Sequence, residues 1–355
     1  MPAAESKGLS NGFVDLRSDT YNLPTHNMLD RLRSTVESPR EGGPQAYTKD
    51  LEQAVAELTG KEAAVFLPTC SAANLLAVMA LARPAENVVV DADSHIRWME
   101  ANSAAVTGGA QLVPVPRAGS IVDAAAVAEF AERASLFGLP PLGLICVENT
   151  HNNAGGLVVS RSDMQGISSL ALEYGARIHV DGARIFNAAA RLGVEVSDLC
   201  VLATTVSLSL NKSLGAPYGA ALAGPQDVIS KVRSLQGQLG IASIHQEGLL
   251  AAMALEALEN NRGRPHLDNG GARELARLLT RYFESELAVP APETNIILFD
   301  ILVDLTAVRF CGQLAARGVL AKPRSARSIR LVVNRESRQH DLEQVIEAFA
   351  GVLGR

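Results

Sequence analysis

Short apolar runs alternate with amphipathic stretches through the middle of the chain. Each run spans five to seven residues and is rich in Val, Ile, Leu and Ala, as strands buried on both faces are. Seven such runs predict strands at residues 63–67, 87–92, 110–115, 142–148, 176–181, 204–210 and 220–224. Strands of this kind joined by helices form a mainly parallel sheet covered on each face. We therefore predict an α/β fold built on a seven-stranded sheet.

The stretches between the apolar runs have the spacing of helices. They predict helices at residues 51–60, 71–82, 123–134 and 161–175 and in the Gly/Ala-rich segment before 204, with two longer ones at 225–237 and 245–261. A shorter α/β pattern then follows, with strands at 295–300 and 328–333 and helices near 305–317 and 340–353.

A polar, turn-rich stretch, ENNRGRPHLDNGG (259–271), separates the two patterns. We predict a large domain of residues 13–265, which includes the N-terminal segment, and a small C-terminal α/β domain of residues 266–355. Residues 1–12 are small and polar and lack the apolar core of a signal peptide, so we expect them to form a flexible leader.

Composition and charge narrow the possible partners. Hydrophobic residues make up 47% of the chain, and the net charge is −6 without a basic run, so we expect no nucleic-acid partner. No apolar stretch approaches the roughly 20 residues that span a bilayer, so we expect no membrane contact. The four cysteines lie far apart without CxxC spacing, which predicts no metal centre, no disulfide framework and a reduced, cytoplasmic protein.

Reactive side chains follow several of the predicted strands, where the active groups of open α/β sheets gather. Lys212 lies just after the strand 204–210, and a lysine there becomes a nucleophile toward carbonyls if burial and a nearby cation lower its pKa. A surface lysine in a loop is the alternative. Asp181 ends the strand 176–181, where it either pairs with a protonated ring nitrogen or caps a helix.

Two further strand ends allow two interpretations each. Thr69, Cys70 and Ser71 lie at the turn from the strand 63–67 into a helix, and a helix start with a hydroxyl beside it is either an anion site or a plain N-cap at Ser71. His95 follows the strand 87–92, where an imidazole either stacks on a flat ring or caps a helix.

Together these segments resemble the threonine aldolase and β-eliminating lyase family of fold-type-I pyridoxal 5′-phosphate (PLP) enzymes. The most specific matches are DLRSDT (15–20), ENTHNNAGG (148–156), HVDGARIFNAA (179–189) and LNKSLGAPYGAALAG (210–224), and the similarity continues to the C-terminal IRLVV. The resemblance implies a PLP-dependent transferase-like fold, an amino-acid substrate, and a homodimer or homotetramer with shared active sites.

The resemblance assigns a role to each strand-end residue. Lys212 matches the lysine that carries PLP as a Schiff base and later shuttles protons. Asp181 matches the partner of the pyridinium nitrogen, which keeps the ring an electron sink. His95 matches the imidazole stacked on the cofactor face, and Cys70 and Ser71 stand where the family has a Gly-Thr pair that binds the phosphate.

The same resemblance points to four more residues. Ser18, Arg184 and Arg330 match residues that hold a cofactor oxygen or the substrate carboxylate, which the planar guanidinium fork binds with two parallel hydrogen bonds. His245 stands where the family has an arginine that helps to hold the phosphate.

Several positions depart from the family pattern. ESPREGGPQAY (37–47) lacks the usual acidic Gly-Asp-Asp-x-Tyr-Gly segment, Asn211 replaces a serine, and FGLPPLG (137–143) has no counterpart of the second active-site histidine. His151 remains, either in the active site or as a residue that stabilises a turn.

Three hypotheses follow. The first is a PLP-dependent lyase that cleaves the Cα–Cβ bond of a β-hydroxy-α-amino acid and gives glycine and an aldehyde. The departures motivate the second, which is PLP-dependent β- or γ-elimination, racemisation or Cα-substitution in a specialised biosynthetic pathway. The third is a non-catalytic protein that keeps the fold as a binding or assembly partner.

Overall fold

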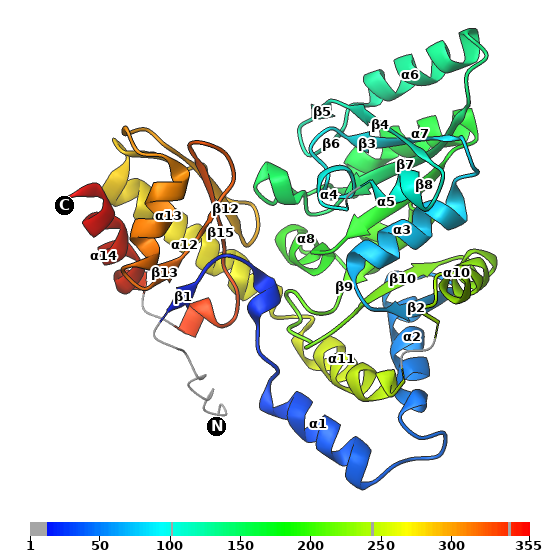
Figure 1. Cartoon of the computed structure of the whole chain (residues 1–355), viewed down its shortest axis with the longest axis horizontal. Coiled ribbons are helices and arrows are strands. Elements are labelled where there is room, and N and C mark those ends of the chain that lie inside the picture. The colour runs from blue at the N-terminus through cyan, green and yellow to red at the C-terminus, as the bar shows by residue number, and fades with distance from the viewer. Residues whose placement is uncertain (1–12, 101, 243–244, 340–341) are drawn as a thin grey trace.

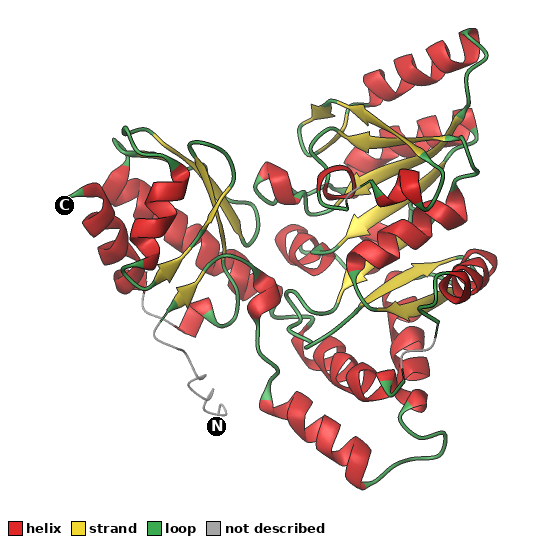
Figure 2. Ribbon diagram, in the orientation of Figure 1, coloured by secondary structure: helices red, strands yellow, loops and turns green. Residues whose placement is uncertain are grey.

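The computed structural model describes residues 13–100, 102–242, 245–339 and 342–355, so the predicted leader lies outside the described residues. Its centre is a seven-stranded sheet with the order β2-β10-β9-β8-β7-β3-β4, flanked by helices (Figures 1 and 2). The strands are β2 (Ala63–Leu67), β3 (Asn87–Asp91), β4 (Gln111–Val115), β7 (Leu142–Glu148), β8 (Arg177–Gly182), β9 (Thr205–Ser209) and β10 (Ala220–Gly224). Every predicted strand is confirmed.

Pairing in this sheet is mainly parallel, as predicted. The strands β9, β8, β7, β3 and β4 run parallel to one another, whereas β10 is antiparallel to both β2 and β9. Parallel strands direct their carboxyl ends to one edge, where the residues after β3, β7, β8 and β9 can meet.

The predicted helices of this region are also present. They are α2 (Gln45–Thr59), α3 (Cys70–Leu81), α6 (Ala124–Leu136), α7 (Arg161–Tyr174), α8 (Ile185–Leu192), α9 (Val196–Cys200), α10 (Gln226–Gln238) and α11 (Glu247–Asn261). The structure adds α1 (His26–Glu37), the short α4 (His95–Trp98) and α5 (Ser103–Val106), and a small hairpin of β5 (Arg117–Ala118) and β6 (Ile121–Val122). None of the described helices is long and apolar enough to cross a membrane.

The C-terminal part has a core of its own. Its four-stranded antiparallel sheet has the order β11-β12-β15-β14, from β11 (Leu287–Ala288), β12 (Ile296–Ile301), β14 (Lys322–Pro323) and β15 (Ser328–Val332). It packs with α12 (Pro265–Phe283), α13 (Ala307–Ala315) and α14 (Leu342–Leu353). Phe283, Phe299, Phe310 and Phe349 form the aromatic centre, with neighbouring ring centroids 5.5–6.4 Å apart.

Two details differ from the expectation at the domain boundary. The helix α12 begins at Pro265, inside the stretch expected to form turns, because proline is favoured at the first helical position. The N-terminal strand β1 (Val14–Asp15) pairs in parallel with β13 (Val319–Leu320), and Val14 and Leu16 are buried in the C-terminal core. The N-terminal residues thus pack on the small unit, although we expected them in the large domain; the division at 265/266 itself stays a prediction.

The helix α11 lies against α1 and α2 (Figure 1), and a glycine allows the close approach to α2. Gly248 is buried in the first turn of α11, and a Cβ atom there would lie 2.0 Å from the Pro44 carbonyl oxygen. Gly166 in α7 is exposed, and a Cβ atom added there would have no neighbouring atom within 4 Å. The two helical glycines therefore differ chiefly in the space around them.

We expect Gly248→Ala to lower the free energy of unfolding by about 1–3 kcal/mol, because backbone atoms must move to admit the methyl group. Gly166→Ala is the matched control and should raise it by about 0.5–1 kcal/mol through helix propensity alone. Urea unfolding followed by circular dichroism measures both. An equal gain in the two variants would contradict the close contact.

Candidate active site

Three neighbouring strands bring polar side chains to one edge of the sheet. Glu148 in β7 is in register with Asp181 in β8, and Asp181 is in register with Ser207 in β9. Lys212 lies in the turn after β9, and His95 begins α4 after β3. The sheet thus gathers the predicted residues Asp181, Lys212 and His95 where parallel strands end.

Asp181 is only 2% exposed, yet it remains ionised. Its Oδ2 accepts a hydrogen bond from Asn74 Nδ2 at 2.9 Å, and its Oδ1 accepts one from the Ala183 backbone N–H at 3.1 Å. Burial alone would raise the pKa of this carboxyl, but the positive charges of His95 and Lys212 and the Asn74 hydrogen bond hold the pKa below its usual value.

Cys70 and Ser71 begin α3, as predicted, but neither is its cap. Thr69 is the N-cap and its Oγ1 accepts a hydrogen bond from the Ala72 N–H at 3.1 Å, so the interpretation of Ser71 as a plain N-cap is wrong. The Cys70 Sγ lies 3.3 Å from Ser207 Oγ and 3.7 Å from Asp181 Oδ1. Burial and the Asp181 charge raise the pKa of this thiol, which keeps it protonated.

His95 is held from two sides. Its backbone N–H donates to Glu148 Oε2 at 2.8 Å, and its Nδ1 lies 3.2 Å from Glu100 Oε1. Burial lowers the pKa of the imidazole, but Glu100, Asp181 and Glu148 together shift it above the usual value.

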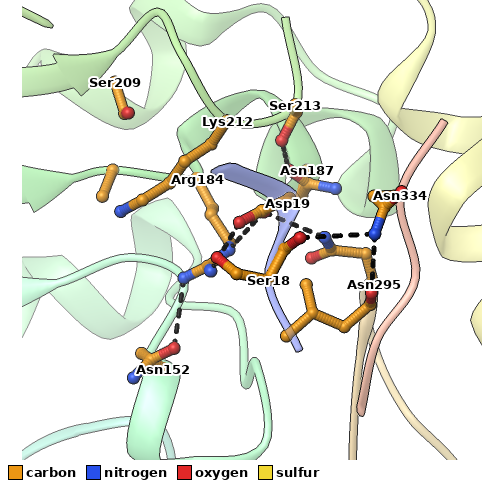
Figure 3. Close-up of polar contacts among 12 residues, drawn as sticks. Ser18, Asp19, Asn152, Arg184, Asn187, Ser209, Lys212, Ser213, Asn295 and Asn334 are labelled. Carbon is orange, nitrogen blue, oxygen red and sulfur yellow. Dashed lines mark hydrogen bonds and ion pairs between the residues drawn. The ribbon is translucent and has the colours of Figure 1, made fainter. Parts of the chain in front are cut away.

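Arg184, at the start of α8, forms a buried ion pair with the N-terminal segment (Figure 3). Its Nε and Nη2 donate to the two carboxylate oxygens of Asp19 at 2.7 and 2.8 Å, and Asp19 has no exposed surface. Asn295 Nδ2 donates to the same carboxylate at 3.1 Å. The neighbouring Ser18 Oγ accepts the Thr20 N–H at 3.2 Å and caps a short 3₁₀ turn, Asp19–Tyr21.

Arg330, in β15, and Arg184 donate hydrogen bonds to the same side-chain amide oxygen, that of Asn152. Asn152 Oδ1 accepts from Arg330 Nη1 at 2.7 Å and from Arg184 Nη1 at 3.2 Å. Arg330 Nε is buried and has no hydrogen-bond partner among the described residues. Burial and the Arg184 charge lower the pKa of Arg330 to about 10. Among the described residues, Arg184 has a protein carboxylate as its partner and Arg330 does not. Two neighbouring guanidinium groups with one carboxylate and a buried donor left over suit a bound carboxylate.

Lys212 is half-buried. Hydrogen bonds of its own backbone carbonyl and of the next side chain hold the turn in which it lies. Its carbonyl oxygen accepts from Asn22 Nδ2 at 3.0 Å and from the Gly215 N–H at 2.9 Å. The Ser213 hydroxyl donates to Asn187 Oδ1 in α8 (Figure 3). The positive charge of Lys212 contributes to the low pKa of both Asp181 and Asp19.

His245 and His151 are not brought into this cluster. His245 is exposed just before α11, and no hydrogen bond or ion pair of the described residues joins it to another predicted site residue. His151 is 1% exposed, its Nδ1 accepts the Ala154 N–H at 3.2 Å, and its Nε2 lies 3.3 Å from Asp91 Oδ1. These contacts favour the turn-stabilising interpretation of His151, whereas phosphate binding by His245 stays a prediction.

Asn74, Glu100, Asp19 and Asn152 were not among the predicted site residues. Asn74 and Glu100 are buried polar residues, and Asn74 interrupts the otherwise apolar face of α3, which was the available signal. Asp19 and Asn152 lie within DLRSDT and ENTHNNAGG, and their place in these family-like segments was the signal that could have identified them.

Comparison with known proteins identifies the family of the chain. The model of the β-eliminating lyase family matches residues 15–302. The chain belongs to the β-eliminating lyase family. This family member is 36% identical to the Arabidopsis thaliana protein named "Probable low-specificity L-threonine aldolase 2", over 95% of this chain and 96% of that one. It is 31% identical to the low specificity L-threonine aldolase of Escherichia coli K12, over 96% of this chain and 100% of that one.

The fold agrees with the same family. The structure of a Leishmania major threonine aldolase superposes with a TM-score of 0.76 at 17% identity, covering 96% of this chain and 98% of that chain. The predicted fold class, a fold-type-I α/β architecture with a mainly parallel sheet, is therefore confirmed.

The buried ion pair gives a testable pH dependence. Asp19→Asn leaves Arg184 without its charged partner and should lower the free energy of unfolding by about 3–5 kcal/mol at neutral pH. Burial opposes ionisation, but Arg184 holds the pKa of Asp19 below its usual value. The contribution is therefore fully present above the unfolded aspartate pKa of about 3.9 and is lost as pH falls through the folded value.

Urea unfolding at a series of pH values measures this difference, which should shrink below about pH 4. Glu274→Gln removes one partner of the surface pair with Arg277 and is the control, with no resolvable change expected. A constant Asp19→Asn difference across the whole pH series would contradict the assignment.

Proposed function

We propose that this member of the β-eliminating lyase family is a PLP-dependent lyase that cleaves the Cα–Cβ bond of a β-hydroxy-α-amino acid, giving glycine and an aldehyde. The observation that carries the proposal is the buried, ionised Asp181 beside the amine-bearing Lys212 at neighbouring strand ends. The matching relatives named as threonine aldolases support this choice of reaction.

The residues at the sheet edge fit PLP. Lys212 supplies an amine for the cofactor carbonyl, and Asp181 is a permanent negative charge for the protonated ring nitrogen. His95 would lie on the ring face, and the first turn of α3, with the hydroxyl of Ser71 and the backbone N–H of Cys70, offers a phosphate site. The Cys70 side chain instead faces Asp181. His245 is assigned to the phosphate of a neighbouring subunit.

The two arginines fit the amino-acid substrate. Arg330 has a buried Nε–H without a partner in the part of the chain that the structure describes, and a substrate carboxylate would satisfy it. Arg184 already binds Asp19 through Nε and Nη2, so Asp19 holds its guanidinium while Nη1 faces Asn152. We assign the carboxylate chiefly to Arg330, with Arg184 and Ser18 beside the cofactor oxygen.

The chain's own groups then move two protons. When bound, PLP accepts the electron pair that the broken Cα–Cβ bond leaves at Cα. The neutral form of His95 accepts the proton of the β-hydroxyl at Nε2 as the aldehyde forms and becomes positively charged, because Glu100 already engages Nδ1. The Lys212 amine returns a proton to Cα to complete glycine.

Purified protein with added PLP should absorb near roughly 420 nm and release glycine and acetaldehyde from threonine. We expect Lys212→Ala to lower kcat by at least about a thousandfold, since it removes the covalent anchor and the proton carrier together. Lys322→Ala changes an exposed lysine of β14 and serves as the control. Release of ammonia and a keto acid without glycine would show elimination and overturn the proposal.

We also propose that the enzyme is a homodimer or homotetramer whose subunits share active sites. The support is the position of His245, which is exposed and outside the cluster of its own chain. A second copy would bring it to the phosphate position. The cytoplasmic location stays a prediction from composition.

Mixing two deficient variants, Lys212→Ala and His245→Ala, tests the sharing. A mixed dimer would contain one intact site, so activity should return to about a quarter of the wild-type value after random exchange. Co-purification of the two variants through a tag carried by one of them shows independently that subunits have exchanged. No gain over the separate variants would contradict shared sites.

A further inference from the structure

Asn74, a buried residue of α3, makes four hydrogen bonds with its side-chain amide. Its Nδ2 donates to Asp181 Oδ2 at 2.9 Å and to Glu100 Oε1 at 2.8 Å. Its Oδ1 accepts from Ser207 Oγ at 2.8 Å and lies 3.0 Å from His179 Nε2. A side-chain amide has two donor hydrogens and two acceptor lone pairs, so this one is fully used.

The neighbours leave the amide one orientation. Two carboxylates lie on its nitrogen side, and only an N–H donor satisfies both. On its oxygen side, burial lowers the pKa of His179 to about 4, so this imidazole is neutral and donates from Nε2. Its Nδ1, 2.9 Å from Thr205 Oγ1, then accepts from that hydroxyl. Rotating Asn74 would break all of these bonds.

Glu100 connects this bridge to His95. The carboxylate side chain is 3% exposed and its Oε1 accepts from Asn74 and faces His95 Nδ1 at 3.2 Å. Burial raises the pKa of Glu100, and the hydrogen bonds with His95 and Asn74 oppose that shift. In its ionised form the carboxylate can only accept, so the imidazole proton sits on Nδ1 and Nε2 is left for the site. His95, Glu100 and Asp181 lie close enough to suggest a cation site, but the Asn74 N–H donors point at both carboxylates where a cation would bind.

We propose that Glu100 is a positioning residue that fixes the tautomer of His95 and, through Asn74, ties this imidazole to Asp181. His95, proposed to lie on the cofactor face, and Asp181, proposed to bind the ring nitrogen, are thus held by the same hydrogen-bond network. The inference rests on the proposed function only for the identity of the cofactor, since the contacts themselves are among the chain's own residues.

The charges around His95 predict the effect of removing one of them. Glu100, Asp181 and Glu148 raise its pKa, whereas burial and Lys212 lower it. Glu100→Gln keeps an oxygen acceptor for Asn74 and Nδ1 but removes the negative charge, so the pKa of His95 should fall. The acidic limb of kcat/KM should then move to lower pH, because His95 acts as a base.

The test uses the whole chain, without and with PLP. Titration of isotope-labelled histidine by NMR, with the His95 signal assigned from His95→Asn, gives its pKa in wild type and Glu100→Gln. Asp93→Asn is the matched control, since it removes an exposed carboxylate two residues from His95 and should leave the pKa nearly unchanged. Glu100→Ala also removes the acceptor and should weaken PLP binding about tenfold or more.

The outcomes separate the two proposals. A lower His95 pKa in cofactor-free Glu100→Gln supports the inference even if the wild-type protein fails to bind PLP, which would sink the proposed function alone. An unchanged His95 pKa in a folded Glu100→Gln, judged by its circular dichroism spectrum, overturns the inference. If Glu100→Gln does not fold, Glu100→Asp moves the carboxylate away from Nδ1 on a shorter side chain, so the His95 pKa should again fall; an unchanged pKa there overturns the inference as well.

Discussion

The site depends on keeping one carboxylate ionised at the buried end of β8. Asp181 is almost inaccessible to water, and a charge in such a place is stable only with hydrogen bonds and nearby positive charge. Asn74 and the Ala183 N–H supply the hydrogen bonds, while His95 and Lys212 supply the positive charge. The groups come from α3, α4 and the turns after β8 and β9, so the charge is satisfied only when all of these meet at one sheet edge.

The short segment 148–152, at the end of β7, connects His95 with the two arginines of the site. The Glu148 carboxylate accepts the backbone N–H groups of His95 and Asn152. The Asn152 side chain in turn receives Arg184 and Arg330. The position of the imidazole and the position of the two guanidinium groups are therefore linked through the segment 148–152. Asp19 neutralises one of those guanidinium groups and leaves the other available to an anion.

Local signals in the chain account for what could be predicted. Strands buried on both faces are continuous apolar runs, and all seven strands of the central sheet were identified from that pattern. The helix α12 was missed because its first turn contains Pro265 and polar residues, which also mark turns. The strand β1 is two residues long, too short for any periodicity, and only its pairing with β13 shows where it belongs.

By itself the sequence determined the fold class and the family and predicted Lys212 and Asp181 as site residues, because strand patterns and motif segments are properties of neighbouring residues. Only the tertiary structure decided which groups share protons and charges. Asn74 binds Asp181 although the two are 107 residues apart in the sequence, and Arg184 binds Asp19 at a separation of 165 residues. Hydrogen bonds and ion pairs act over a few ångströms between such distant segments, so their partners become apparent only when the chain is folded.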